Sequence, residues 1–160
     1  ISLDKKNKFP IMVNASLLLT AGIIFSGIVI INNYPGTFGS KQSDNLGKGD
    51  VTLDMYQWDY FKSEFNTIYK ANLKNGTTTT KFIVNNKWFP AAHIDNYIAQ
   101  PLHLSFVGLG KLEDIHTYAW LNNYREKLKK GDDAYFITFS NTFSNPNELY
   151  SKSFEKINND

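Results

Sequence analysis

Polar and aromatic side chains in the second half of the sequence are the best candidates for contact with a ligand. Their charges, amides and flat rings could hold an anionic or a sugar ligand, above all where Asp114 and His116 precede Arg125. The alternative is that such residues form a satisfied polar network at the edge of a sheet. We expect a ligand-facing rim made of Lys87, Trp88, His93, Asp95, Asp114, His116, Tyr118, Trp120, Arg125 and Asn141.

The same residue types do not indicate metal or nucleophile chemistry. His93 and Asp95 are two positions apart and do not share a helix face, and a metal site would need His103 and His116 to converge with carboxylates. The sequence has no cysteine and no Gly-x-Ser-x-Gly turn. We therefore expect no catalytic residue, no metal ligand and no cofactor-binding residue in this chain.

The turn Gly108-Leu109-Gly110 is the one feature that suggests a nucleotide. It follows an apolar run and precedes a helical pattern, as the first glycines of a dinucleotide-binding turn do. The third glycine of that pattern is missing, because Glu113 stands in its place. A tight turn out of a strand explains these glycines better, and a small nucleotide-binding domain remains an alternative to test.

Apolar runs and helical patterns in residues 81–139 predict the elements that carry these side chains. In order, they are a strand at 81–84, a helix at 91–100, a strand at 104–107, a long helix from about 112 or 114 to 130, and a strand at 134–139. Strands joined through helices are normally parallel, so we expect a small three-layer Rossmann-like α/β domain with a mainly parallel sheet. Ligands of such a sheet gather at the carboxyl ends of its strands, where the sequence places Asn85, Asn86, Lys87, Trp88, Gly108, Gly110, Lys111, Ser140 and Asn141.

Segments on both sides of this unit also have structural signals. Apolar residues three or four apart between Asp54 and Leu73 predict a helix whose aromatic stripe packs in the core. In the polar tail, residues 145–148 indicate a turn or the start of a helix. Phe154 and Ile157 could add a last short strand.

Residues 11–31 carry no charge and would form a helix about as long as a bilayer core of ~30 Å. A buried helix or a signal peptide is the alternative. Lysines precede this run and no charge follows it before Lys41, which predicts a cytoplasmic N-terminal end. The expected domains are a basic cytoplasmic flank at 1–10, a transmembrane helix at 11–31, a connector at 32–50 and an extracytoplasmic α/β domain at 51–160.

The charge balance bears on the partners of the protein. The 17 basic and 15 acidic residues are interspersed and give a formal charge of +2. No basic patch for a polyanion is apparent, so nucleic acid is not an expected partner. The first residue is Ile1 rather than Met, and we expect the chain to belong to a longer protein.

Four segments, taken in order, carry a resemblance to a known family. They are Asp54-Met55-Tyr56-x-Trp58, Lys87-Trp88-Phe89-Pro90-Ala91-Ala92-His93-Ile94-Asp95-x-Tyr97, Gly110-x-Leu112-x-Asp114-Ile115-His116-x-Tyr118-Ala119-Trp120 and Gly131-Asp132-Asp133-Ala134-Tyr135. With the preceding apolar run, they resemble the C-terminal part of bacterial protein mannosyltransferase-like membrane glycosyltransferases. This is the dolichyl-phosphate-mannose-protein mannosyltransferase type of the GT-C superfold. The resemblance covers most of residues 51–141.

The resemblance implies a longer enzyme in the bacterial inner membrane that transfers a sugar from a polyprenyl-phosphate carrier to an acceptor on the outer face. In that family the acidic catalytic residue lies near the N-terminus, between early membrane helices, so no catalytic residue is implied here. This chain would be an accessory, non-catalytic part. The implied partners are membrane lipid, the remaining transmembrane helices of the same chain, and a lipid-linked sugar or glycan acceptor. A single-pass membrane-anchored module that binds a ligand or a protein is the alternative from another class.

Overall fold

The computed structural model describes residues 8–158, and their contacts divide the chain into two compact units. The first unit ends at Tyr56 and contains a long apolar helix and a connector. The second begins at Gln57 and contains all three strands of the described chain, together with the helices that cover them. Residues 1–7, which include Lys5 and Lys6 of the expected basic flank, lie outside the described residues.

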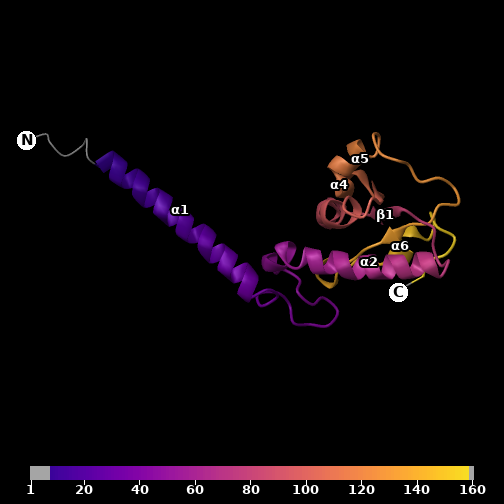
Figure 1. Cartoon of the computed structure of the whole chain (residues 1–160), viewed down its shortest axis with the longest axis horizontal. Helices are drawn as coiled ribbons and strands as arrows, with labels where there is room; N and C mark the ends of the chain where they lie inside the picture. The colour runs from indigo at the N-terminus through magenta and orange to yellow at the C-terminus, as the bar shows by residue number, and fades with distance from the viewer. Residues whose placement is uncertain (1–7, 159–160) are drawn as a thin grey trace, which may run out of the picture. The chain divides into compact units, whose positions relative to one another are not determined.

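Helix α1 (Lys8–Asn33) runs without interruption (Figure 1). Its segment Pro10–Asn33 has 24 residues and is long and apolar enough to cross a membrane. At 1.5 Å per residue this segment is about 36 Å long. The side chains on successive positions are exposed, with Leu18 at 74%, so the apolar surface extends around the helix and suits a lipid environment.

Two asparagines close the carboxyl end of α1. The side-chain amide of Asn32 donates to the Ile28 carbonyl and that of Asn33 to the Val29 carbonyl, each at 2.9 Å. The last carbonyls of a helix have no partner within the helix itself. The asparagines therefore satisfy these carbonyls where the apolar segment ends.

The connector folds around the buried carboxylate of Asp50. One oxygen accepts the backbone N–H groups of Phe38, at 2.9 Å, and Gly39, at 3.1 Å. The other accepts the backbone N–H and the hydroxyl of Thr52. The Thr52 hydroxyl and these N–H groups hold the pKa of Asp50 below its ordinary value, because all of them bond the ionised form.

The helix expected between 54 and 73 is divided in two. A short 3-10 turn, η1 (Val51–Met55), is followed by α2 (Trp58–Lys74). Gln57 separates them because it is left-handed, with φ 55° and ψ 29°, which a continuous helix does not permit. Helix α2 buries Phe65 in the core, as its apolar stripe predicts.

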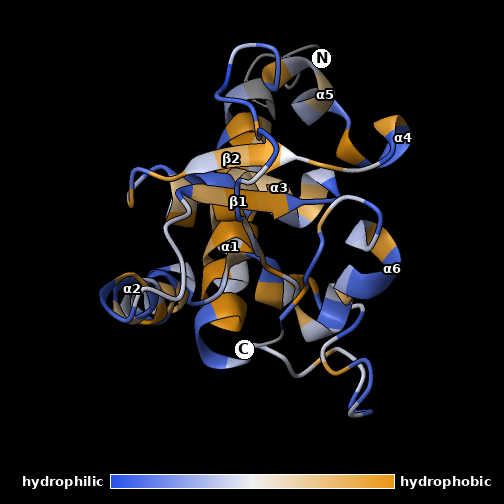
Figure 2. Cartoon of the chain, turned by 90° about the vertical axis from the view of Figure 1, so that its right-hand side faces the viewer, coloured by the Kyte–Doolittle hydropathy of each residue, from blue (hydrophilic) through white to orange (hydrophobic). Residues whose placement is uncertain are grey.

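The sheet has three parallel strands in the order β2-β1-β3. They are β1 (Phe82–Asn85), β2 (Ser105–Gly108) and β3 (Tyr135–Phe136). Figure 2 shows β1 and β2 side by side and largely hydrophobic. The prediction of a parallel sheet in a mixed helix-and-strand domain is confirmed, but β3 is much shorter than the strand expected at 134–139.

Apolar side chains cover both faces of the sheet. One cluster joins Ile83 and Phe106 of the strands to α2 and to α3 (Trp88–Ile94), which leads into one π-helical turn, η2 (Asp95–Ala99). The other cluster joins Phe82 and Val84 to the C-terminal segment. Neighbouring residues of β1 thus point to opposite faces, and both are buried, as expected for a parallel strand.

The prediction of one long helix from about residue 112 or 114 to residue 130 is wrong. Two short helices take its place, α4 (Leu112–Ile115) and α5 (Thr117–Leu121), separated at His116, whose φ of 47° and ψ of −120° are not helical. Beyond α5, the Asn122 side chain accepts from the Gly108 N–H at 3.1 Å and donates to the Gly108 carbonyl at 2.7 Å. These bonds tie residues after 121 to the free edge of β2, so the helix does not continue.

The polar tail contains one turn, η3 (Ser140–Thr142), and one short helix, α6 (Pro146–Tyr150). Asn145 caps α6 by accepting the Asn147 N–H at 3.0 Å, which confirms the helix start predicted at 145–148. The prediction of a last strand around Phe154 and Ile157 is wrong, because the described residues after α6 form no strand. Both side chains pack against the second apolar cluster from an irregular segment.

Candidate binding site at the carboxyl edge of the sheet

The carboxyl ends of β1 and β3 lie next to each other, and the chain leaves them in opposite directions. After β1 it enters α3, whose Ala91 and Ile94 pack on one face of the sheet. After β3 it reaches α6, whose Tyr150 packs on the other face. In open parallel sheets, a crevice forms where the connections of two neighbouring strands diverge in this way, and ligands bind there.

A shallow depression of about 460 Å³ lies at this point of the second unit. We call it the edge depression. Its walls come from the loop after β1 and from the segment around the start of α6. The lining residues are Asn86, Lys87, Phe143, Ser144, Asn145, Glu148 and Leu149.

The buried side chain of Asn85 joins the two walls. Its amide donates to the Ile137 carbonyl at 2.8 Å, and its side-chain oxygen accepts the Lys87 N–H at 3.0 Å. The first bond reaches the segment that follows β3, and the second fixes the loop that follows β1. Asn85 therefore holds Lys87 in place at the rim of the edge depression.

Asn86 and Lys87 bring polar groups to the edge depression without a protein partner. Asn86 is only 7% exposed, and within residues 8–158 no other side chain or backbone group is hydrogen-bonded to its side-chain amide. Lys87 is half-buried, and its ammonium group likewise forms no ion pair in that range. No polar side-chain atom of the described chain is both buried and unpaired, so the Asn86 amide must keep access to solvent.

The opposite wall is fixed by α6. The Asn145 amide donates to the Glu148 carboxylate at 3.0 Å, which orients that carboxylate. Behind it, the buried Tyr150 hydroxyl donates to the Leu109 carbonyl at 2.9 Å. Burial raises the pKa of Tyr150, so this phenol keeps its proton and its bond. The short helix is thus anchored to the turn after β2.

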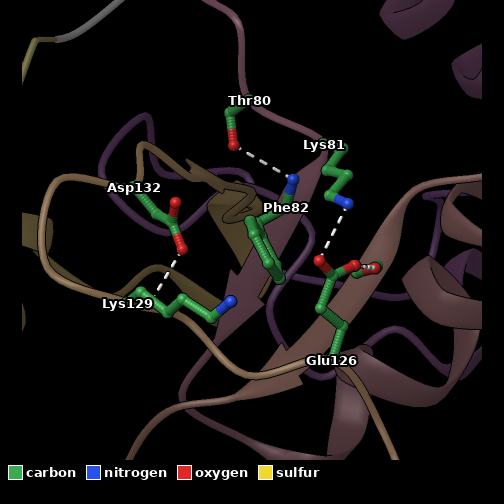
Figure 3. Close-up of polar contacts among 7 residues, drawn as sticks. Thr80, Lys81, Phe82, Glu126, Lys129 and Asp132 are labelled. Carbon is green, nitrogen blue, oxygen red and sulfur yellow. Dashed lines mark hydrogen bonds and ion pairs between the residues drawn. The ribbon is translucent and has the colours of Figure 1, made fainter.

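The amino edge of the sheet differs, because its polar groups are paired with one another (Figure 3). The Lys81 ammonium lies 2.8 Å from the Glu126 carboxylate, whose other oxygen accepts the Ser105 hydroxyl at 3.1 Å. The bond from Lys81 lowers the pKa of Glu126. Thr80 accepts the Phe82 N–H at 3.0 Å and donates its hydroxyl to the Asp133 carbonyl. This edge therefore offers fewer free groups to a ligand.

A buried polar cluster connects η2 to the segment after α5. The Asp95 carboxylate lies 2.7 Å from the Arg125 guanidinium and accepts the Tyr118 hydroxyl at 3.1 Å. Arg125 also donates to the Phe106 carbonyl at 3.4 Å. Burial, followed by the negative charge of Asp95, raises the pKa of Tyr118. The partners satisfy one another, so this cluster is a structural network.

Aromatic rings gather near the start of α3. The Trp58 ring stacks on the imidazole of His93, with centroids 5.0 Å apart, and on the ring of Tyr97, at 5.6 Å. The Trp88 and His116 rings meet edge to face at 5.8 Å, and both side chains are exposed. The backbone of His116 is in a region that costs about 1–3 kcal/mol for a residue with a Cβ.

The expected ligand-facing rim is distributed over several places. Lys87 alone lines the edge depression, whereas Trp88 and His116 form an exposed pair with each other. The expected set of Asp114, His116 and Arg125 does not come together, because Arg125 binds Asp95. The remaining places are the His93 stack, the buried cluster of Asp95, Tyr118 and Arg125, the exposed contact of Trp120 with Tyr124, and Asn141 in η3.

Two of the seven residues that line the edge depression, Asn86 and Lys87, belong to the rim that the sequence predicts at the end of the first strand, and the other five were not predicted. Asn145 and Glu148 stand three apart, in the spacing of a reciprocal helix cap, which is a signal for α6 but not for a site. That α6 returns to the end of β1 has no local signal.

The side chains that could hold a metal do not cluster. Over residues 8–158, no group of three histidine, cysteine, aspartate or glutamate residues is placed to share an ion. Comparison of the chain with protein-family models, with curated proteins and with solved structures finds no match.

Proposed function

We propose that this chain is the C-terminal part of a polytopic membrane glycosyltransferase that transfers a sugar from a polyprenyl-phosphate carrier to an acceptor. In this proposal α1 is the last membrane helix, and the second unit is an accessory, non-catalytic domain on the extracytoplasmic side of a bacterial inner membrane. The observation that carries the proposal is α1 itself, whose 24-residue apolar segment has exposed side chains along its length.

Features of α1 favour a helix that packs among others. No atom lies within 4 Å of a side chain added at Gly22 or Gly27, so another helix could approach the backbone closely there. Asn14, Ser16 and Thr20 add weakly polar groups that suit contacts between membrane helices better than contacts with lipid alone. These features support the remaining transmembrane helices of a longer chain as partners.

The second unit supports the proposal through its architecture. Its sheet has apolar clusters on both faces, consistent with the three-layer Rossmann-like arrangement that we propose for it. The ordered segments that resemble mannosyltransferase-like enzymes include the rim residues Lys87 and Trp88. The donor would be a polyprenyl-phosphate sugar, bound elsewhere in the longer enzyme.

A self-contained, single-pass membrane-anchored binding module is the second candidate. The edge depression favours it, because a site with unpaired polar side chains at the carboxyl edge of a sheet serves a binding protein as well as an enzyme. Under this alternative α1 is only an anchor. Under both candidates the edge depression lies on the extracytoplasmic side of the membrane.

The two candidates differ in a transfer experiment. An affinity tag is added after Asp160 at the natural gene, and the tagged protein is purified into lipid nanodiscs and supplied with a polyprenyl-phosphate-linked radioactive hexose and a membrane extract as acceptor. We expect the tagged protein from the natural gene to be much longer than 160 residues and to transfer the radioactive hexose to the acceptor. The 160-residue chain expressed alone should transfer none. A natural product of only this length without transfer would favour the binding module. Transfer by the 160-residue chain alone would contradict the non-catalytic role.

A further inference from the structure

We propose that the edge depression is a carbohydrate-binding site that takes a neutral hexopyranose unit. The proposed function assigns no ligand to the second unit, and binding at this site does not depend on α1. Its role as the place where a transferase holds an acceptor glycan rests on the proposed function. The binding itself is measured separately.

The edge depression has a position typical of ligand sites in open parallel sheets. The edge depression lies between the carboxyl ends of neighbouring parallel strands β1 and β3, where the following connections pass to opposite faces of the sheet. Ligands of open parallel sheets bind where such connections diverge. A volume of about 460 Å³ falls within the range of small-molecule sites, ~300–1,000 Å³.

Asn86 is a largely buried residue whose side-chain amide has no hydrogen-bond partner within the described residues. Among the described residues, the buried ones with charged, amide or aliphatic hydroxyl side chains are Asp50, Thr52, Thr80, Asn85, Asn86 and Asp95. Five of the six have side-chain hydrogen bonds within the protein. Asn86 is the exception, and it lines the edge depression. Because the Asn86 amide keeps access to solvent in the edge depression, it is available to donate to and accept from a ligand there.

The walls of the edge depression carry both hydrogen-bond donors and acceptors. Lys87 and the Asn86 amide supply donors, while the Glu148 carboxylate and the Asn86 carbonyl supply acceptors. Adjacent hydroxyls of a sugar both donate and accept, so they need such a mixed set. The Phe143 ring, 61% exposed, adds an apolar surface for the C–H face of a pyranose.

The charge of the walls argues against an anionic ligand. Lys87 and Glu148 are the charged residues of the lining, and their formal charges cancel. A phosphate or nucleotide site normally gathers several donors or cations around the anion. The glycine turn does not supply them, because neither Gly108 nor Gly110 lines the edge depression.

The test uses the full chain in lipid nanodiscs, free of sugar-based detergents. Saturation-transfer NMR records binding of methyl α-mannopyranoside, methyl α-glucopyranoside and methyl β-galactopyranoside. We expect transfer to at least one of them. Binding should weaken about fivefold or more in Phe143→Ala and in Glu148→Gln, because each removes one contact to the sugar. Inorganic phosphate should not compete.

The control variant is Phe38→Ala, which removes an equally exposed ring, 67% exposed, from the connector. It should bind as the unchanged chain does, and all variants should keep the same melting temperature. No transfer to any of the three glycosides would overturn the proposal, as would unchanged binding in Phe143→Ala. Displacement of the glycoside by inorganic phosphate would also overturn the proposal, because it would show that the site takes an anion. Glycoside binding without enzymatic transfer by the natural protein would keep the site and reject the transferase.

Discussion

The guanidinium of Arg125 lies 2.7 Å from the carboxylate of Asp95, and together they join the π-helical turn after α3 to the segment after α5. The Asp95 side chain is 8% exposed and that of Arg125 is 25% exposed. Each therefore depends on the other for most of its lost hydration. The pair holds the segment after α5 against the turn after α3.

Replacing Arg125 with methionine should strongly destabilise the second unit. It leaves a buried carboxylate whose remaining partner is the Tyr118 hydroxyl, and breaking such a pair costs about 3–5 kcal/mol. The free energy of unfolding is measured by urea denaturation of the full chain, followed by tryptophan fluorescence. The matched control is Lys62→Met, which breaks the exposed ion pair with Asp59 and should cost less than about 1 kcal/mol. Equal effects of the two variants would contradict a buried, essential pair.

The double variant Asp95→Asn with Arg125→Met tests the same pair in a second way. Removing both charges leaves no ionised group without a partner, so the double variant should be more stable than Arg125→Met alone. The coupling is the loss of unfolding free energy in the double variant minus the losses in the single variants Arg125→Met and Asp95→Asn. A double variant whose loss equals the sum of the two single losses would show that Asp95 and Arg125 do not act together.

The two glycines of the turn after β2 should each resist substitution. A Cβ at Gly108 would lie 2.5 Å from the Tyr118 Cβ, and one at Gly110 would lie 2.7 Å from the Asn86 carbonyl oxygen. Neither neighbour can swing aside, so Gly108→Ala and Gly110→Ala should each cost about 1–3 kcal/mol of unfolding free energy. Gly22→Ala has no neighbour within 4 Å and should leave the second unit unchanged. Stability equal to the unsubstituted chain at Gly108 would show that the turn is not closely packed.

Acid should loosen the connector through Asp50. Its pKa is lowered from an ordinary value of 3.8, so its stabilising contribution is complete above that value and is lost as the pH falls through the lower, folded pKa. Hydrogen exchange at the Phe38 and Gly39 amides should therefore speed up in wild type only at pH below about 3.8. In Asp50→Asn it should already be fast at neutral pH, because an amide oxygen is a weaker acceptor than a carboxylate. Unchanged exchange in the variant would contradict this anchoring role.

The sequence predicted features that depend on near neighbours. The apolar helix, the short strands and the capped start at Asn145 all have local signals, and the structure has each of them. The predicted long helix was wrong because Asn122 and Arg125 bond to distant residues at β2. Helix period and charge placement are the same in either arrangement, so they could not distinguish the two.

The candidate site depended even more on distant contacts. Lys87 was predicted because it follows a strand, and it does line the edge depression. Phe143 and Glu148 come from a polar tail without apolar period, and only the packing of Tyr150 under Leu109 brings that tail to the end of β1. A prediction of this site would have required the order of the strands and the face that α6 covers.

The proposed function depends on the location of the second unit on the extracytoplasmic side of the membrane. The sequence has no cysteine, so single cysteines can be introduced without background. Ser151→Cys reports on the second unit and Ser2→Cys on the N-terminal end. A membrane-impermeant maleimide should label Ser151→Cys in intact cells and Ser2→Cys only after permeabilisation. Labelling of Ser2→Cys in intact cells, with Ser151→Cys protected until permeabilisation, would contradict the account.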